Sequence, residues 1–180
     1  RTAIGSFLGQ FTGTPTTALG TAAISAALAH SGLAADQVDE VIMGCVLPAG
    51  LGQAPARQAA RGAGIPDAAG CTTINKVCGS GMKAVMLAHD LIKAGSAQVV
   101  VAGGMESMTN APYLADGARG GFRYGNTELR DAIIADGLWC AFDACLMGLG
   151  TDRYTAGSIS REEQDEFAAR SNELAAAAIK

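Results

Sequence analysis

The stretch "TTINKVCGSGMKAVMLAHDLIKAG", residues 72–95, decides the fold because it joins a strand pattern to a helix pattern at one cysteine. The run "CTTINKVC" (71–78) is rich in β-branched residues and predicts a strand. From Ser80 to Gly95, apolar residues recur at helical spacing and predict a helix. These residues are Met82, Val85, Met86 and Ile92. The sequence therefore places Cys78 at the end of a strand, one turn before a helix begins.

The sequence around this stretch alternates helix and strand patterns. Thr14 and Pro15 are the expected cap and first-turn proline of a helix that ends at Gly32. Further expected elements are a strand at 40–48, an alanine-rich helix at 53–64 and a strand at 97–104. The last strand is continuously apolar, which suits a buried parallel sheet. The alternation predicts an α/β layered fold.

After about Ser107 the composition changes, and Gly, Asn and mixed charges dominate. We therefore expect two parts, an α/β part at 1–107 that contains Cys78 and a partial, loop-built domain at 108–180. The last segment begins with a capping box, Ser160 with Glu163. The chain begins without methionine, and its last helix lacks a stop signal. We expect a piece of a longer protein.

Composition excludes several classes of protein. The 180 residues are 49% hydrophobic and 17% charged, with a formal net charge of −4, and no cluster of Lys and Arg suits a nucleic acid. No apolar run approaches the ~20 residues that span a bilayer, and the first residues do not resemble a signal peptide. We expect a soluble, cytoplasmic protein that binds neither nucleic acid nor membrane. Five cysteines without a C-x-x-C pair, and two histidines, indicate neither a disulfide framework nor a zinc site.

The position of Cys78 suggests chemistry, although a buried packing role is an equal alternative on position alone. Open α/β sheets bind ligands at the carboxyl ends of their strands, and a helix N-terminus stabilises a thiolate or an oxyanion. This effect is worth at most ~2 kcal/mol, or about one pKa unit. A strong nucleophile needs a further base, and neither His30 nor His89 is expected within reach.

The other reactive side chains are expected to be structural. Cys45 in mid-strand and Cys71 at a strand start are predicted core residues, and packing is also the expected role of Cys140 and Cys145. Glu106 follows a glycine pair in "GGMESM", which lacks the spacing of a phosphate loop. We expect its carboxylate to bind nearby backbone.

Several motifs together resemble one family. The segment "NKVCGSGMKA" (75–84) resembles the nucleophile segment of the thiolases, specifically the acetyl-CoA acetyltransferase and 3-ketoacyl-CoA thiolase group. Further matching segments, in the family's order, are "RTAIGSF" (1–7), "GQAPARQAARGAGIP" (52–66), "VVVAGGMESMTNAPYL" (99–114), "ARGGFRYG" (118–125), "DGLWCAFDACLMG" (136–148) and "SREEQDEFAARS" (160–171). The likeness covers nearly the whole chain.

The resemblance implies a fold, an activity and a site. The fold would be the thiolase-like layered αβαβα fold, here its first repeat with part of the inserted loop domain. Cys78 would be the acyl-accepting nucleophile and a backbone oxyanion donor, Leu138 and Met147 would line the acyl and pantetheine pocket, and Arg57 would lie near a dimer interface. No metal or organic cofactor is implied, and coenzyme A is a substrate. The expected assembly is a homodimer or homotetramer.

This sequence also departs from the family pattern. Leu146 stands where the family often has histidine, and Cys140 where it has aspartate. The family's later histidine and second cysteine are absent, so we expect this chain alone to be inactive. Two alternatives remain: another condensing enzyme of the superfamily, such as a ketoacyl synthase, or a non-catalytic subunit for acyl-CoA binding or assembly.

Overall fold

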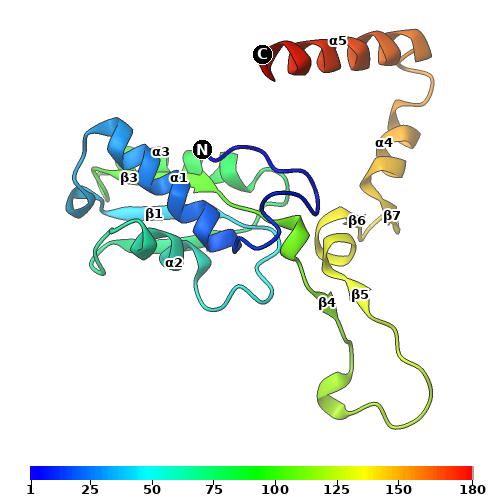
Figure 1. The fold of residues 1–180 in the computed structure, drawn as a ribbon, viewed down its shortest axis with the longest axis horizontal. Coiled ribbons are helices and arrows are strands. Elements are labelled where there is room, and N and C mark those ends of the chain that lie inside the picture. Colours follow the sequence, from blue (N-terminus) through cyan, green and yellow to red (C-terminus); the bar gives the residue numbers. More distant parts are fainter. Residues whose placement is uncertain (180) are drawn as a thin grey trace. The chain divides into compact units, whose positions relative to one another are not determined.

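The computed structural model describes residues 1–179 and divides into two compact units, Arg1–Gly137 and a second unit that begins at Leu138. The first unit is an α/β domain with an irregular extension (Figure 1). Its main elements are α1 (Thr16–Ser31), η1 (Ala35–Gln37), β1 (Glu40–Gly44), α2 (Pro55–Gly62), β2 (Gly70–Ile74), α3 (Ser80–Lys93) and β3 (Val100–Gly104). The predicted order of helices and strands is confirmed.

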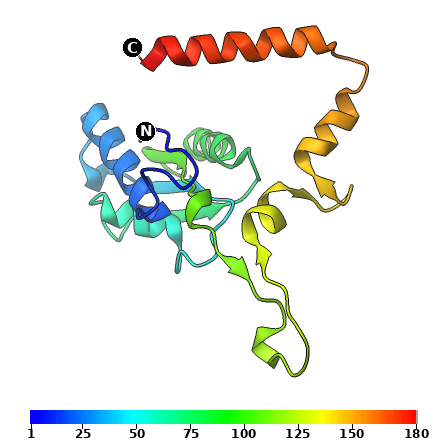
Figure 2. The same ribbon diagram turned by 45° about the vertical axis from the view of Figure 1, so that its right-hand side comes forward.

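The three strands form one parallel sheet in the order β2-β1-β3. Glu40 of β1 lies opposite Gly70 of β2 and Val100 of β3. Because the connections β1-α2-β2 and β2-α3-β3 run in opposite directions across the sheet, right-handed crossovers place α2 and α3 on opposite faces. Helix α1 packs on α2, so α1 and α2 share one face and α3 covers the other (Figure 2). This arrangement confirms the predicted α/β layered class.

The hydrophobic core lies between the sheet and the α1–α2 pair. Alternate residues of β1, Val41 and Met43, are at most 2% exposed and point toward this pair. They pack with Ile24, Val38, Ala56, Ala59, Ala60, Ile65, Ala69 and Met105. Small alanines on α2 let its backbone approach the sheet closely, so this face is fully packed.

Helix α3 has two different faces. Its small residues Ser80, Ala84 and Ala88 are buried against the sheet. Its large apolar residues are exposed, with exposed fractions of 73% for Met82, 56% for Val85 and 52% for Met86. The helical period was predicted correctly. However, the large side chains lie on the outer face and the small ones form the contact with the sheet.

Element ends differ in places from the predictions. Pro15, not Thr14, occupies the position before α1, and it makes no side-chain cap. The predicted stop at Gly32 is confirmed, because this residue has φ of 71° and closes the helix. Strands β1 and β2 end at Gly44 and Ile74, four residues earlier than expected, since the chain then turns to bind side chains described below.

Two short strands extend the first unit after β3. η2 (Met108–Asn110) leads into β4 (Tyr113–Leu114), which pairs antiparallel with β5 (Arg130–Asp131), and η3 (Ala118–Gly120) lies between them. An ion pair of 2.8 Å between Arg130 and Asp116 links the two sides of this loop. The proposed domain boundary near Ser107 stays a prediction.

The second unit contains little buried surface. After the π-helix η4 (Ile133–Leu138), β6 (Trp139–Cys140) and β7 (Cys145–Leu146) form a hairpin, followed by α4 (Met147–Thr155) and α5 (Arg161–Ile179). The predicted capping box is confirmed: the Ser160 N–H donates to Glu163 Oε2 at 2.8 Å, and the Glu163 N–H donates to Ser160 Oγ at 3.2 Å. The bond from the Ser160 N–H to the carboxylate is the main cause that lowers the pKa of Glu163, with a further contribution from the Ser160 side chain. None of the helices within residues 1–179 has the length and apolarity that a membrane crossing requires.

Candidate active site

The candidate site lies where the carboxyl ends of the three strands meet. The Cys45 N–H donates to the Ile74 carbonyl at 3.0 Å, and the Met105 N–H donates to the Gly44 carbonyl at 2.9 Å, so the ends of β2, β1 and β3 are joined. The connections that leave β1 and β2 go to helices on opposite faces of the sheet. Such a position is where open α/β sheets form a ligand crevice.

Two side chains shape the turn that contains Cys78. Ser80 Oγ accepts the Lys76 N–H at 2.8 Å and donates to the Val77 carbonyl at 2.6 Å. Asn75 Oδ1 accepts the Val77 N–H at 2.8 Å, and Asn75 Nδ2 donates to the Val46 carbonyl at 3.3 Å. Ser80 is only 4% exposed. The turn is therefore held by two half-buried bonds from Ser80 and two exposed bonds from Asn75.

The residue before Cys78 has an unusual backbone conformation. Val77 has φ of 46°, in the left-handed region that a β-branched side chain rarely adopts. Such a conformation costs on the order of 1–3 kcal/mol and persists only where surrounding bonds impose it. Here the bonds from Asn75 and Ser80 do so. Strain is thus stored directly beside the thiol.

A glycine in β1 allows the start of α3 to lie close against the sheet. A Cβ at Gly44 would lie 2.6 Å from both the carbonyl carbon and the Cβ of Ser80, and 2.8 Å from the nitrogen of Gly81. No side chain fits at such distances. Gly44 therefore sets how deeply the N-terminus of α3, and the turn before it, can sit at the sheet edge.

Cys78 itself is exposed and reduced. It lies two residues before Ser80, the first residue of α3, where unpaired N–H groups and the helix dipole favour negative charge. Neither histidine is close along the chain: His89 is eleven residues further along this helix, about 16 Å at 1.5 Å per residue. It pairs with Asp90 at 3.2 Å, and His30 lies in the last turn of α1, which precedes the amino end of β1. As expected, no base for Cys78 is evident in these two residues.

The neighbouring cysteine after β1 has the opposite character. Cys45 is 1% exposed, and its thiol contacts Glu106 Oε1 at 3.6 Å. Burial and the Glu106 charge raise the pKa of Cys45 to about 12. Glu106 also accepts the Val46 N–H at 2.7 Å and the Leu47 N–H at 3.1 Å. The predictions of a core thiol and of a carboxylate that binds backbone are confirmed, although Cys45 follows β1 instead of lying inside it.

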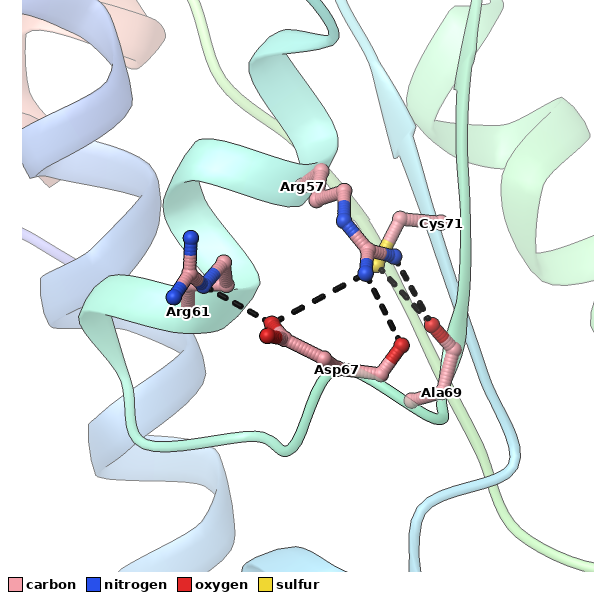
Figure 3. A network of polar contacts seen from close by, with 5 residues as sticks. All are labelled: Arg57, Arg61, Asp67, Ala69 and Cys71. Carbon is pink, nitrogen blue, oxygen red and sulfur yellow. Dashed lines mark hydrogen bonds and ion pairs between the residues drawn. The ribbon is translucent and has the colours of Figure 1, made fainter.

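Arg57 holds the loop between α2 and β2 (Figure 3). Its guanidinium donates to the carbonyls of Asp67 and Ala69, at 2.8 Å and 3.2 Å, and Asp67 also pairs with Arg61 at 2.8 Å. Cys71 lies beside this group, half-buried. Burial raises the pKa of its thiol, and the Arg57 charge partly opposes this shift. Arg57 therefore has a structural role in the loop, and its expected place near a dimer interface stays a prediction.

The two expected pocket residues belong to the second unit. Leu138 directly precedes β6 and Met147 directly follows β7, so both lie at the open end of the hairpin. Their exposed fractions are 37% and 48%. Cys78 belongs to the first unit. The hairpin brings Leu138 and Met147 together, and their part in a common pocket with Cys78 stays a prediction.

Sequence reasoning missed four residues that shape the turn. Asn75 could have been found, because an Asn two residues before a backbone N–H often forms this type of turn. The hydroxyl of Ser80 binds the turn before α3 and makes no cap of the helix. The role of Gly44 depends on packing between β1 and the start of α3, which no local pattern indicates. The left-handed conformation of Val77 follows from the bonds that Asn75 and Ser80 make, which β-propensity does not indicate.

Comparison with known proteins shows which family the chain is similar to. The family model described as thiolase, N-terminal domain, matches residues 1–180. The chain is 52% identical to an acetyl-CoA acetyltransferase of Pseudomonas aeruginosa over 180 residues, covering 99% of this chain and 46% of that protein. It is 51% identical to one of Cupriavidus necator, covering 100% and 46%, and 50% identical to a mitochondrial one of Rattus norvegicus, covering 93% and 39%.

The chain thus spans less than half the length of these curated relatives, and the match lies in the domain that the family model places first. A single family accounts for the match along all 180 residues. The parallel sheet with helices on both faces agrees with this assignment. The chain belongs to the thiolase family and corresponds to its N-terminal domain.

Proposed function

We propose that this chain supplies the acyl-accepting part of a coenzyme A-dependent acyltransferase, with Cys78 as the nucleophile. The observation that carries the proposal is the exposed Cys78 on a strained, hydrogen-bonded turn at the N-terminus of α3. The similar proteins named acetyl-CoA acetyltransferase support an acyl-CoA as the substrate class. The reaction interconverts acetoacetyl-CoA or another 3-oxoacyl-CoA, plus CoA, with acetyl-CoA and an acyl-CoA.

The chemistry proceeds in two halves. The Cys78 thiolate attacks the 3-oxo carbon of the 3-oxoacyl-CoA, the bond between C2 and C3 breaks, and the acetyl-CoA carbanion that leaves takes up a proton. The thiolate of a second CoA then attacks the acyl-cysteine, which releases acyl-CoA and restores the Cys78 thiolate. A backbone N–H at Cys78 and the start of α3 stabilise the oxyanion in both halves.

The geometry of the turn suits this role. An exposed thiol lets a bulky thioester approach, and the bonds from Ser80 and Asn75 hold the backbone in one conformation. Preorganised donors of this kind stabilise charge without reorganisation during the reaction. The helix dipole alone contributes at most ~2 kcal/mol, so a second group must complete activation. We propose that this second group is a residue other than His30 and His89.

The proposal also covers the substrate site, the cofactors, the location in the cell and the oligomeric state. Leu138 and Met147 line the acyl and pantetheine site. Coenzyme A serves as a substrate, and neither a metal nor an organic cofactor takes part. The protein works in the cytoplasm as a homodimer or homotetramer, which sedimentation of the full-length gene product at micromolar concentration would test.

The test is turnover by the full-length gene product. Thiolysis of acetoacetyl-CoA is expected to fall below detection in Cys78→Ala, because no thiol remains to accept the acyl group. The matched control is Cys71→Ala, which removes a half-buried thiol from β2 and should keep at least a tenth of the activity. Unchanged turnover in Cys78→Ala would overturn the proposal.

A shorter polypeptide tests the division of the site. Residues 1–180 produced alone are expected to show no thiolysis, because the described residues place neither histidine near Cys78. Steady turnover by this polypeptide would show that the missing base lies within residues 1–180.

A further inference from the structure

The hairpin β6–β7 places two cysteines side by side. Cys140 of β6 lies directly opposite Cys145 of β7 in the antiparallel register, and four residues, 141–144, connect the strands. Directly opposed residues of an antiparallel pair project from the same face, with Cα atoms about 4.5–5.5 Å apart. A disulfide requires Cα atoms about 4.4–6.8 Å apart. The backbone therefore already has the spacing of a cross-strand disulfide.

Both thiols are reduced, and each has a different neighbour. The Cys140 thiol donates to Asp143 Oδ2 at 3.2 Å, and Cys140 Sγ accepts the Asp143 N–H at 3.4 Å. Cys145 is 5% exposed, and its Sγ lies 3.8 Å from where a Cβ at Gly150 of α4 would be. Joining the two sulfurs requires rotation of the side chains, which is a much smaller change than movement of the strands. Cys140 is half-buried and is the more accessible of the two.

We propose that Cys140 and Cys145 form an oxidisable dithiol, a redox modification site that a peroxide closes to a disulfide. The Cys140 thiol releases its proton and its sulfur attacks one oxygen of hydrogen peroxide; the O–O bond breaks, a sulfenic acid forms, and the hydroxide that leaves takes up the released proton as water. The Cys145 sulfur then attacks the sulfenic sulfur, the S–O bond breaks and a second water leaves. The two sulfurs are oxidised, the peroxide is reduced, and a dithiol reductant reverses the change.

The position of the pair gives oxidation a consequence for substrate binding, and this part rests on the proposed function. Leu138 and Met147 lie at the open end of the same hairpin. Closing the disulfide turns the Cys145 side chain toward Cys140 and away from Gly150, in the first turns of α4, where Met147 is the first residue. We expect oxidation to raise the KM for acetoacetyl-CoA several-fold.

One peptide reports the disulfide without any activity measurement. Trypsin cleaves after Arg130 and Arg153, and the peptide between them contains Cys140 and Cys145 and no other cysteine. The full-length gene product would be treated with graded hydrogen peroxide, alkylated with iodoacetamide and digested without reduction. The proposal expects this peptide to lose two hydrogen atoms and to escape alkylation, with alkylation restored by dithiothreitol.

Variants make the result specific. Cys140→Ser and Cys145→Ser should each abolish the two-hydrogen loss, whereas Cys78→Ser should leave it unchanged. The proposal is contradicted by sulfinic or sulfonic acid at Cys140 with Cys145 still alkylated, by a disulfide that joins either residue to Cys78, or by a disulfide between two molecules. Because Cys78→Ser lacks the proposed nucleophile, formation of the disulfide in that variant is independent of the proposed function.

A kinetic comparison separates the effect of the pair from oxidation of Cys78. Peroxide should raise the KM in the wild type but not in the variant with Cys140→Ser and Cys145→Ser together, while direct oxidation of Cys78 affects both alike. If the disulfide forms and the KM of the two proteins changes equally, the link to substrate binding is wrong. If Cys78 fails to accept an acyl group while the disulfide still forms, the proposed function is wrong and the redox proposal stands.

Discussion

Two cysteines follow neighbouring strands at the same edge of the sheet, and they differ in exposure and in the groups that surround them. Cys45 follows β1, is 1% exposed, and has a pKa raised to about 12 by burial and by Glu106. Cys78 follows β2 after three intervening residues and is exposed two residues before α3 begins. The turn after β2 therefore does more than connect β2 to α3, because it places the Cys78 thiol in an exposed position at the sheet edge.

The difference arises from the bonds that each segment makes. After β1 the chain runs along Glu106, whose carboxylate accepts two backbone N–H groups and lies beside the Cys45 thiol. After β2 the side chains of Asn75 and Ser80 bind the backbone and hold Val77 in a left-handed conformation. Burial and the Glu106 charge suppress ionisation of Cys45, whereas Cys78 is exposed two residues before a helix N-terminus. The same sheet edge thus supports one inert and one accessible thiol.

The largest expected effect is in the rate of alkylation. The rise in the pKa of Cys45 from its ordinary 9.0 to about 12 lowers its thiolate fraction about a thousandfold, and burial slows reagent access further. In the native protein, iodoacetamide is therefore expected to label Cys78 at least ~1,000 times faster than Cys45. Time-resolved peptide mapping measures both rates in one sample. Rates within about tenfold of each other would contradict the contrast.

Gly44→Ala is expected to disturb the turn strongly. The new Cβ would lie 2.6 Å from the carbonyl carbon and the Cβ of Ser80, so α3 must move away from the sheet. We expect a loss of about 3 kcal/mol in the free energy of unfolding, and a large loss of acyl transfer to Cys78. The matched control is Gly103→Ala on β3, whose Cβ would lie 3.6 Å from Met43 Sδ, an ordinary contact. Equal effects of the two substitutions would show that this close approach is unimportant.

Ser80→Ala removes the hydroxyl that joins Lys76 to Val77 and leaves a half-buried N–H and carbonyl without this partner. We expect a loss of about 1–3 kcal/mol in the free energy of unfolding. The rate of Cys78 acylation should fall roughly 10- to 100-fold, since a thioester must meet a turn that is no longer held in one conformation. Ser31→Ala is the control, because its hydroxyl binds the Leu28 carbonyl at the exposed end of α1. A rate unchanged by Ser80→Ala would exclude a positioning role for the hydroxyl.

A small effect per pH unit is expected in the stability of the protein at alkaline pH. Above about pH 9 the unfolded chain releases the Cys45 proton, whereas the native state keeps it until about pH 12, so this thiol makes the protein less stable as pH rises. One such proton is worth up to ~1.4 kcal/mol per pH unit in this range. Cys45→Ala should therefore flatten the alkaline decline of the urea unfolding free energy. A decline equally steep in variant and wild type would contradict the raised pKa.

The sequence was sufficient for the order of elements but not for their contacts. Periodicity located α3, and β-branched residues located β2, because these signals are local. The apolar period alone did not indicate which face of α3 meets the sheet: Met82 and Val85 are exposed, and Ala84 and Ala88 are buried against the sheet. A pattern gives the spacing of a face but cannot say which neighbour that face meets.

The site was only partly predictable for the same reason. Cys78 was identified from its place between a strand and a helix, and Glu106 from its expected bonds to nearby backbone. The fit of Gly44 depends on Ser80 and Gly81, which are distant in sequence. The bonds of Ser80 and the conformation of Val77 are local, but propensity and periodicity do not specify the side-chain hydrogen bonds that create them. The pairing of Cys140 with Cys145 across the hairpin likewise depends on the register of β6 and β7, which composition does not specify.

The central claim is that Cys78, alone among the five cysteines, accepts the acyl group. The most direct measurement incubates the full-length gene product with acetyl-CoA, stops the reaction in acid and maps all five cysteine peptides by mass. We predict one acetyl group, on Cys78, released on addition of CoA, with Cys45 unmodified. An acetyl group on Cys140 or Cys145 instead, or no acetylated cysteine in a protein that still performs thiolysis, would contradict the account.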